Sequence, residues 1–191
     1  AKYFTCKYLN LTDCKTETTI QINQKKINNT KKYFDDNKFN IVIGAGSSGP
    51  DTRWGEENFS NLLNELNKEG EFFFFIQAGP DQIDISKKII SNIKKKNCMD
   101  LSNISVREIV PFFALCDMYV GNDSFMHHVT SQSQKPSVVL LIRGGARRRT
   151  QICIHTYIHT CITYLLTYLH THILTYLHTY ILTYLHTCIL T

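Results

Sequence analysis

The sequence lacks the cysteine and histidine spacings that build small zinc-bound or disulfide-bonded domains. Cys6 and Cys14 are too far apart for a zinc knuckle, and Cys98 and Cys116 have no Cys or His close by in sequence. Scattered thiols of this kind suit a reducing compartment, so we expect a cytoplasmic protein. The N-terminus also lacks a basic region followed by an apolar stretch, and we therefore expect no secretory signal peptide.

The last part of the chain lacks charge. Every Asp, Glu, Lys and Arg precedes residue 150, although the formal net charge of the whole chain is +5. From Thr156 to Thr191, Thr recurs nearly every fourth residue among Tyr, Ile, Leu and His. Structural repeats have periods of roughly 20–50 residues, so this pattern is no solenoid. Three copies of the DNA tetranucleotide ACAT encode Thr-Tyr-Ile-His, which is the unit of this pattern. We therefore predict that the tail is translated simple-sequence DNA.

These differences divide the chain into three parts. We predict a partial lead-in segment over 1–38, a regular domain over 39–142, and an unstructured low-complexity tail over 143–191. Two alternatives for the tail stay open. One is a membrane helix, since the tail is uncharged and longer than the ~20 residues that a span needs; the other is a His-rich metal site. The arginines near its start, Arg143 and Arg147–Arg149, suggest a junction rather than a nucleic-acid patch.

The middle part alternates strands with helices. The lead-in is irregular, with short strands expected at 3–11 and 18–23 and a short helix at 29–34. Apolar runs then predict strands at 39–43, 72–77, 98–101, 118–121 and 137–142, and helical spacing predicts helices at 56–69, 83–95, 105–116 and 125–134. Ser105 with Glu108 predicts a capping box. The alternation predicts an α/β fold with a Rossmann-like parallel sheet covered on both faces.

Three loops follow predicted strands, at the sheet edge where such folds bind ligands. They are "GAGSSGPDTRW", "QAGPDQ" and "VGNDSFMHH". The first contains G-x-G-x-x-G, but a dinucleotide site needs the third Gly inside the first turn of a helix and an acid about 20 residues later. Pro50 follows Gly49 directly, and the first acid after the next strand is Asp81. The context therefore disfavours an NAD site, and we expect the loop to bind the phosphates of another ligand.

The third loop and its continuation, "GNDSFMHHVTSQSQKP", resemble the signature of glycosyltransferase family nine, the heptosyltransferases of lipopolysaccharide core synthesis. Arg53-Trp54 is similar to the end of the phosphate loop of that family, and Ala78–Gln82 is similar to its G-G-x-x-E element. The order and spacing of all three match over about residues 40–142.

The resemblance implies one half of a GT-B glycosyltransferase, which has two Rossmann-like domains with the active site between them. This chain resembles the C-terminal half, which binds a nucleotide-sugar donor, usually ADP-heptose. The acceptor half, with the proposed catalytic base, would precede residue 1, so we assign no catalytic residue and expect this chain alone to be inactive. The implied partners are the donor and a lipopolysaccharide-type glycan acceptor at the inner face of the cell membrane. No cofactor, metal or nucleic acid is expected.

Backbone N–H groups in a glycine-rich loop or at a helix start solvate a diphosphate well. Ser124, Phe125 and Met126 offer such amides, Ser47 and Ser48 add hydroxyls, and Arg53 adds a cation. By resemblance, Asp123 faces sugar or ribose hydroxyls, His128 meets a phosphate, and Gln82 or Asp81 meets the ribose. The predicted donor-binding set is Gly46, Ser47, Ser48, Arg53, Gln82, Asp123, Ser124, Phe125, Met126 and His128.

Each role has a structural alternative. Asp123 could cap the helix that follows it, His128 could be a core histidine, Arg53 could form a surface ion pair, and Gln82 could serve a turn. Three departures from the family pattern also matter: Thr52 replaces a lysine, Gln82 a glutamate, and Phe125 a glycine. They motivate a second hypothesis, that of a non-catalytic nucleotide-binding module or degenerate relative.

Overall fold

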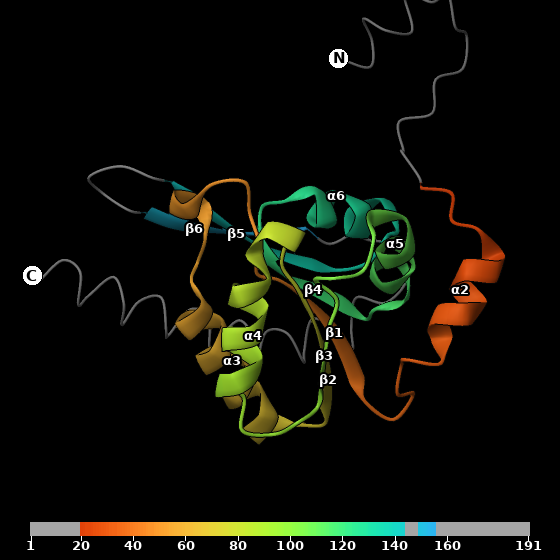
Figure 1. Cartoon of the computed structure of the whole chain (residues 1–191), viewed down its shortest axis with the longest axis horizontal. Coiled ribbons are helices and arrows are strands. Elements are labelled where there is room, and N and C mark those ends of the chain that lie inside the picture. The colour runs from red at the N-terminus through yellow and green to blue at the C-terminus, as the bar shows by residue number, and fades with distance from the viewer. Residues whose placement is uncertain (1–19, 144–148, 156–191) are drawn as a thin grey trace, which may run out of the picture.

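The computed structural model describes residues 20–143 and 149–155. These residues form one six-stranded sheet in the order β3-β2-β1-β4-β5-β6 (Figure 1). Strands β1 to β5 pair in parallel, and β6 pairs antiparallel with β5. The strands are β1 (Phe39–Gly44), β2 (Phe72–Gln77), β3 (Cys98–Asp100), β4 (Met118–Asn122), β5 (Ser137–Arg143) and β6 (Arg149–His155).

Helices cover both faces of this sheet. Figure 1 shows α3 and α4 on one side of the strands and α5 and α6 on the other, with α2 beyond α5. Short 3₁₀ turns, η1 (Pro50–Thr52) and η2 (Pro80–Gln82), precede α3 and α4. The helices are α2 (Gln24–Lys31), α3 (Glu56–Glu69), α4 (Ile83–Asn92), α5 (Val106–Leu115) and α6 (Phe125–Gln132).

The central strand β1 separates two apolar cores. Ile41 and Ile43 face the core under α3 and α4, whereas Val42 faces the core under α5 and α6. All three side chains are fully buried. A strand buried on both faces needs a continuous apolar run rather than alternation. The predicted doubly covered parallel sheet is therefore confirmed.

The lead-in segment differs from its prediction. Residues 20–23 form no strand, and the helix begins at Gln24 instead of Asn29. The reason is a helix cap: the side chain of Asn23 accepts a hydrogen bond of 2.8 Å from the N–H of Lys25. An asparagine at this position satisfies one of the backbone donors that the first helical turn leaves over. The strand expected at 3–11 lies outside the described residues.

The predicted capping box at the start of α5 is wrong. Ser105 is the N-cap residue, but its side chain makes no capping hydrogen bond. Glu108 forms an ion pair with Lys26 instead. In a capping box the Glu108 carboxylate would bond to the backbone N–H of Ser105. Here it pairs with Lys26 of α2 instead, and this ion pair links α5 to α2.

The prediction of an unstructured tail is wrong for one stretch. β6 pairs along the whole of β5, from Ser137 opposite His155 to Arg143 opposite Arg149. The edge of β5 offers a row of backbone N–H and C=O groups that another strand can satisfy. Residues 144–148 and 156–191 lie outside the described part, and with them the membrane and metal alternatives. No helix in the described part is long and apolar enough to cross a membrane.

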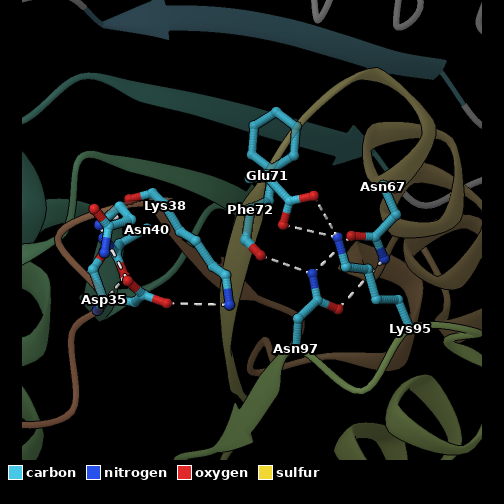
Figure 2. A network of polar contacts seen from close by, with 9 residues as sticks. Asp35, Lys38, Asn40, Asn67, Glu71, Phe72, Lys95 and Asn97 are labelled. Carbon is cyan, nitrogen blue, oxygen red and sulfur yellow. Dashed lines mark hydrogen bonds and ion pairs between the residues drawn. The ribbon is translucent and has the colours of Figure 1, made fainter.

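Polar contacts close the amino ends of the strands (Figure 2). Before β1, Lys38 pairs with Asp35 at 3.1 Å, and the side-chain amide of Asn40 donates to the Lys38 carbonyl at 2.7 Å. Around β2, Lys95 pairs with Glu71 at 2.9 Å, and the buried Asn97 donates to the Phe72 carbonyl at 2.7 Å. Charged and amide groups at this end thus find partners within the chain.

A hollow of about 580 Å³ opens at this same amino end, next to α2 and the end of α5. Asn40 and Asp117 line it, and they are already bonded, since the N–H of Asn40 donates to Asp117 Oδ2 at 2.7 Å. Lys38 lines it too and is paired with Asp35. The hollow lies at the opposite ends of the strands from the three glycine-containing loops.

Candidate functional site

The three predicted loops meet at the carboxyl end of the sheet, because β2, β1 and β4 are neighbours there. Gly44 at the end of β1 is in register with Gly121 of β4 and with Gln77 of β2. A Cβ on Gly121 would lie 2.5 Å from the Gly44 carbonyl oxygen, and one on Gly44 would overlap the Tyr119 hydroxyl. Glycine at both positions lets the strand ends approach so closely.

Asn122, the last residue of β4, fastens both ends of the first loop. Its side chain is fully buried, donates to the Ala45 carbonyl at 2.8 Å and accepts from the Trp54 N–H at 3.0 Å. Asn122 is not among the site residues predicted from the sequence. The available clue was an amide side chain directly after an apolar strand, since a buried amide must find partners.

Tyr119 holds the backbone of Asn122 in place. It is fully buried, and its hydroxyl donates to the Asn122 carbonyl at 2.8 Å. Burial raises the pKa of Tyr119, so the hydroxyl keeps its proton and remains a donor. Trp54 packs edge-on against Phe59 at 5.0 Å between ring centroids and is buried, so it serves packing.

Gln82, in the second loop, bonds to the first loop through both polar atoms of its amide. Its Oε1 accepts from the Ser47 N–H at 3.2 Å, and its Nε2 donates to the Ser47 carbonyl at 2.8 Å. Gly46 lies at the same contact, where a Cβ would be 2.9 Å from Gln82 Oε1 and 3.0 Å from the Gly79 nitrogen. The close approach of the two loops therefore accounts for the glycine at position 46.

Ser47 and Ser48 differ sharply in their surroundings. Ser47 is buried, and its hydroxyl donates to the Gly49 carbonyl at 2.8 Å and lies 2.7 Å from the Thr52 hydroxyl. Ser48 is exposed, and within residues 20–143 its hydroxyl and the N–H groups of Ser48 and Gly49 have no hydrogen-bond partner. Ser47 thus shapes the loop, whereas Ser48 and Gly49 hold unused donors.

Arg53 lies half-buried where this loop returns to α3. Its Nη2 donates to the Ser47 carbonyl at 3.3 Å, and its buried Nε has no partner among the described residues. The pKa of Glu56 is lowered mainly by its hydrogen bond with Lys88, and the charge of Arg53 lowers it further. Gly49 precedes η1 and not α3. This placement agrees with the inference against a dinucleotide fingerprint.

The third loop leads into α6. Ser124 is the N-cap residue, and the N–H groups of Ser124, Phe125 and Met126 find no acceptor in the part of the chain that the structure describes. Asp123 does not cap the helix, so that alternative is wrong, and its side chain is 53% exposed. Phe125 is 55% exposed, an unusual position for a large aromatic ring.

The two histidines of α6 point to different environments. His128 is exposed, which contradicts the alternative of a core histidine, whereas His127 is buried with its Nδ1 3.7 Å from Asp123 Oδ1. The possible ligand atoms of Asp123, His127 and His128 lie within 4.8 Å of one another. These three residues could hold a metal ion, so the expected absence of a metal stays a prediction.

A parallel sheet with glycine-rich and helix-starting donors at its carboxyl end is the architecture of a Rossmann-like ligand-binding domain. A sequence profile for glycosyltransferase family 9 (heptosyltransferase) matches residues 2–143. The chain belongs to that family. A comparison with curated protein sequences finds no match.

Solved structures show the same fold. The chain is similar to E. coli ADP-heptose lps heptosyltransferase II, with 20% identity and a TM-score of 0.58 over 64% of this chain and 39% of that one. It is also similar to the family 9 glycosyl transferase from Veillonella parvula, with 18% identity and a TM-score of 0.62 over 70% of this chain and 40% of that one. A third similar structure is E. coli heptosyltransferase WaaC with ADP, with 18% identity and a TM-score of 0.56 over 70% of this chain and 41% of that one. The chain thus spans 39–41% of the length of these proteins.

Proposed function

We propose that this domain binds the nucleoside-diphosphate part of a nucleotide-sugar donor, as the donor half of a glycosyltransferase. The observation that carries the proposal is the set of unused donors at the ends of two adjacent strands. One group is Ser48 and Gly49 after β1, and the other is Ser124 to Met126 after β4. Backbone N–H groups of this kind are suited to phosphate oxygens.

Positive charge beside the first loop also favours a diphosphate. Arg53 places a guanidinium there, and cations bond to phosphate oxygens more strongly than neutral donors do. Negative charge builds on the leaving diphosphate as the sugar departs. Fixed donors that meet this growing charge stabilise the transition state more than the bound substrate.

The remaining predicted residues suit the nucleoside and the sugar. Asp123 and His128 are exposed beside the amides of α6, where they can reach hydroxyl and phosphate groups. Phe125 offers an exposed ring on which a base can stack. We take ADP-heptose as the first donor to test and a cell-envelope glycan of the lipopolysaccharide type as the acceptor, with the reaction at the cytoplasmic face of the membrane and without a cofactor.

The described residues contain one Rossmann-like unit, whereas GT-B transfer takes place between two. We therefore propose that these 191 residues bind the donor but do not transfer its sugar by themselves. A second candidate, a non-catalytic nucleotide-binding module, is favoured by Thr52. Its hydroxyl donates inward to the Gly49 carbonyl at 2.8 Å, so this position supplies no cation to the ligand.

Calorimetric titration of the full chain with ADP and ADP-sugars tests the first proposal. We expect Arg53→Ala and Asp123→Ala each to weaken ADP binding at least tenfold, because each removes a charged partner worth roughly 1.5–3 kcal/mol. Lys95→Ala, at the amino end, is the control and should leave the affinity unchanged. The proposal is wrong if ADP fails to bind at millimolar concentration or if the three variants behave alike.

A fusion separates the two candidates. The chain is joined to the acceptor domain of a family 9 enzyme, and sugar transfer is measured with and without Arg53→Ala. Transfer that depends on Arg53 supports the glycosyltransferase. A fusion that binds ADP normally but transfers no sugar supports the binding module. Turnover by the unfused chain would contradict the proposed need for a second domain.

A further inference from the structure

We propose that Gln82 is a positioning residue: it holds the first loop in the conformation that binds the diphosphate, and it does not contact the donor itself. The inference rests on the proposed function, since its readout is ligand affinity. It differs from the role that the family resemblance implied for this position, which is a contact with the ribose.

The geometry of the amide carries the inference. Both polar atoms of the Gln82 side chain are bonded to one residue, Ser47, at 3.2 Å to its N–H and at 2.8 Å to its carbonyl. A backbone N–H can only donate and a carbonyl can only accept, so this pairing fixes which way the Gln82 amide is turned. Gln82 keeps both bonds only while its amide stays turned toward Ser47.

Gln82 is itself held in place. Its N–H donates to the Gly79 carbonyl at 2.8 Å, and the Ala78 N–H donates to the hydroxyl of the buried Ser102 at 3.0 Å. Gly46 packs closely against Gly79 and Gln82: a Cβ there would lie 3.0 Å from the Gly79 nitrogen and 2.9 Å from Gln82 Oε1, so these neighbours would have to shift. The second loop is thus a fixed support, and the amide of Gln82 is its connection to the first loop.

Ser47 passes this constraint to the donors. Once its backbone is held by Gln82, its hydroxyl bonds to the Gly49 carbonyl and closes the turn around Ser48. The N–H groups of Ser48 and Gly49, which follow directly, are those left unused in the described structure. Fixing such donors before the ligand arrives reduces the entropy that binding must overcome.

Methionine and glutamate at position 82 separate the two bonds. Gln82→Met keeps an unbranched side chain of similar length but removes both hydrogen bonds. Gln82→Glu can still accept from the Ser47 N–H, but a carboxylate has no proton to donate to the Ser47 carbonyl. Gln24→Met makes the same chemical change on the exposed α2, where the amide bonds only to Asn28, and serves as the matched control.

The test is titration of the full chain with ADP and with its two parts, pyrophosphate and adenosine. We expect Gln82→Met to weaken ADP and pyrophosphate about tenfold while adenosine changes less than twofold, and Gln82→Glu to lie between it and the wild type. Gln24→Met should match the wild type. Hydrogen exchange at the Ser47 amide should be faster in Gln82→Met, because its bond to Gln82 is lost, with the thermal midpoint showing that the variant is folded.

Different failures have different meanings. If Gln82→Met weakens adenosine as much as ADP, Gln82 contacts the nucleoside and the inference is overturned while the proposed function survives. The inference is likewise overturned, and the proposed function kept, if none of the ligands responds to Gln82→Met although the wild type binds them. If the wild type binds neither ADP nor pyrophosphate, the proposed function fails and the inference fails with it.

Discussion

The two ends of this sheet use similar side chains to opposite effect. At the amino end, Lys38 pairs with Asp35 and the N–H of Asn40 donates to Asp117, so Lys38, Asn40 and Asp117, which line its hollow of about 580 Å³, are already partnered. At the carboxyl end, the amides of Asn122 and Gln82 bond to the first loop and hold it in place. The N–H groups of Ser48 and Gly49 in that loop have no acceptor among the described residues. The carboxyl end is therefore the end whose unused donors suit a ligand.

The largest effect should come from the buried asparagines, one at each end. Asn122→Ala removes the partner of the Ala45 carbonyl and of the Trp54 N–H, and Asn97→Ala removes the partner of the Phe72 carbonyl. Each loss should cost about 2–4 kcal/mol of unfolding free energy, measured with urea, because buried polar groups lose their bonds.

Only the carboxyl-end variant should also lose its ligand. We expect ADP binding by Asn122→Ala to fall below detection, since both ends of the first loop are released, whereas Asn97→Ala should bind as the wild type does. Titrations are made at a temperature where circular dichroism shows both variants folded. Equal affinity losses in the two variants would remove the functional distinction between the two ends.

A medium effect is expected for the exposed ring of Phe125. Phe125→Ala should weaken ADP about three- to tenfold and leave pyrophosphate unchanged, because stacking on an aromatic ring contributes roughly 0.5–1.5 kcal/mol. Val106→Ala is the control, since Val106 is 56% exposed, close to the 55% of Phe125, but begins α5 rather than α6. An equal loss for pyrophosphate would place Phe125 against the phosphates and not the base.

The smallest effect concerns the ion pair at the amino end. The hydrogen bond with Lys95 lowers the pKa of Glu71 below its ordinary value of 4.5. The folded state therefore gains from this carboxylate above about pH 4.5, and the gain is lost as the pH falls through the lowered pKa. Glu71→Gln should lower the thermal midpoint slightly at pH 7 and by less as the pH falls through the lowered pKa of Glu71, with ADP affinity unchanged. A difference that grows on acidification would contradict this assignment.

Much of the fold follows from local pattern. The first long strand is predicted at 39–43 and spans Phe39–Gly44, because a buried central strand needs an unbroken apolar run. The meeting of the three loops also follows, since parallel strands end on the same edge. The start of α2 does not follow, because the polar lead-in has little periodicity and the helix start depends on one local bond from the Lys25 N–H to Asn23.

The site is only partly predictable from the sequence. The exposed donors on Ser48 and α6 follow from a glycine-rich loop and a helix start. The roles of Asn122 and Gln82 do not, because an amide can bond to a ligand or to the backbone with the same atoms, and only three-dimensional packing decides between them. The same holds for Ser47, whose hydroxyl shapes the loop although the sequence suggests a donor to the ligand.

The pairing of β6 with β5 has a consequence for how such domains gain length. The family match ends at residue 143, yet the strand that completes the sheet begins at Arg149. A ladder of main-chain hydrogen bonds requires a strand of suitable length and position, but it depends little on which side chains that strand carries. An open sheet edge can therefore be completed by sequence that lies beyond the matched region of the family.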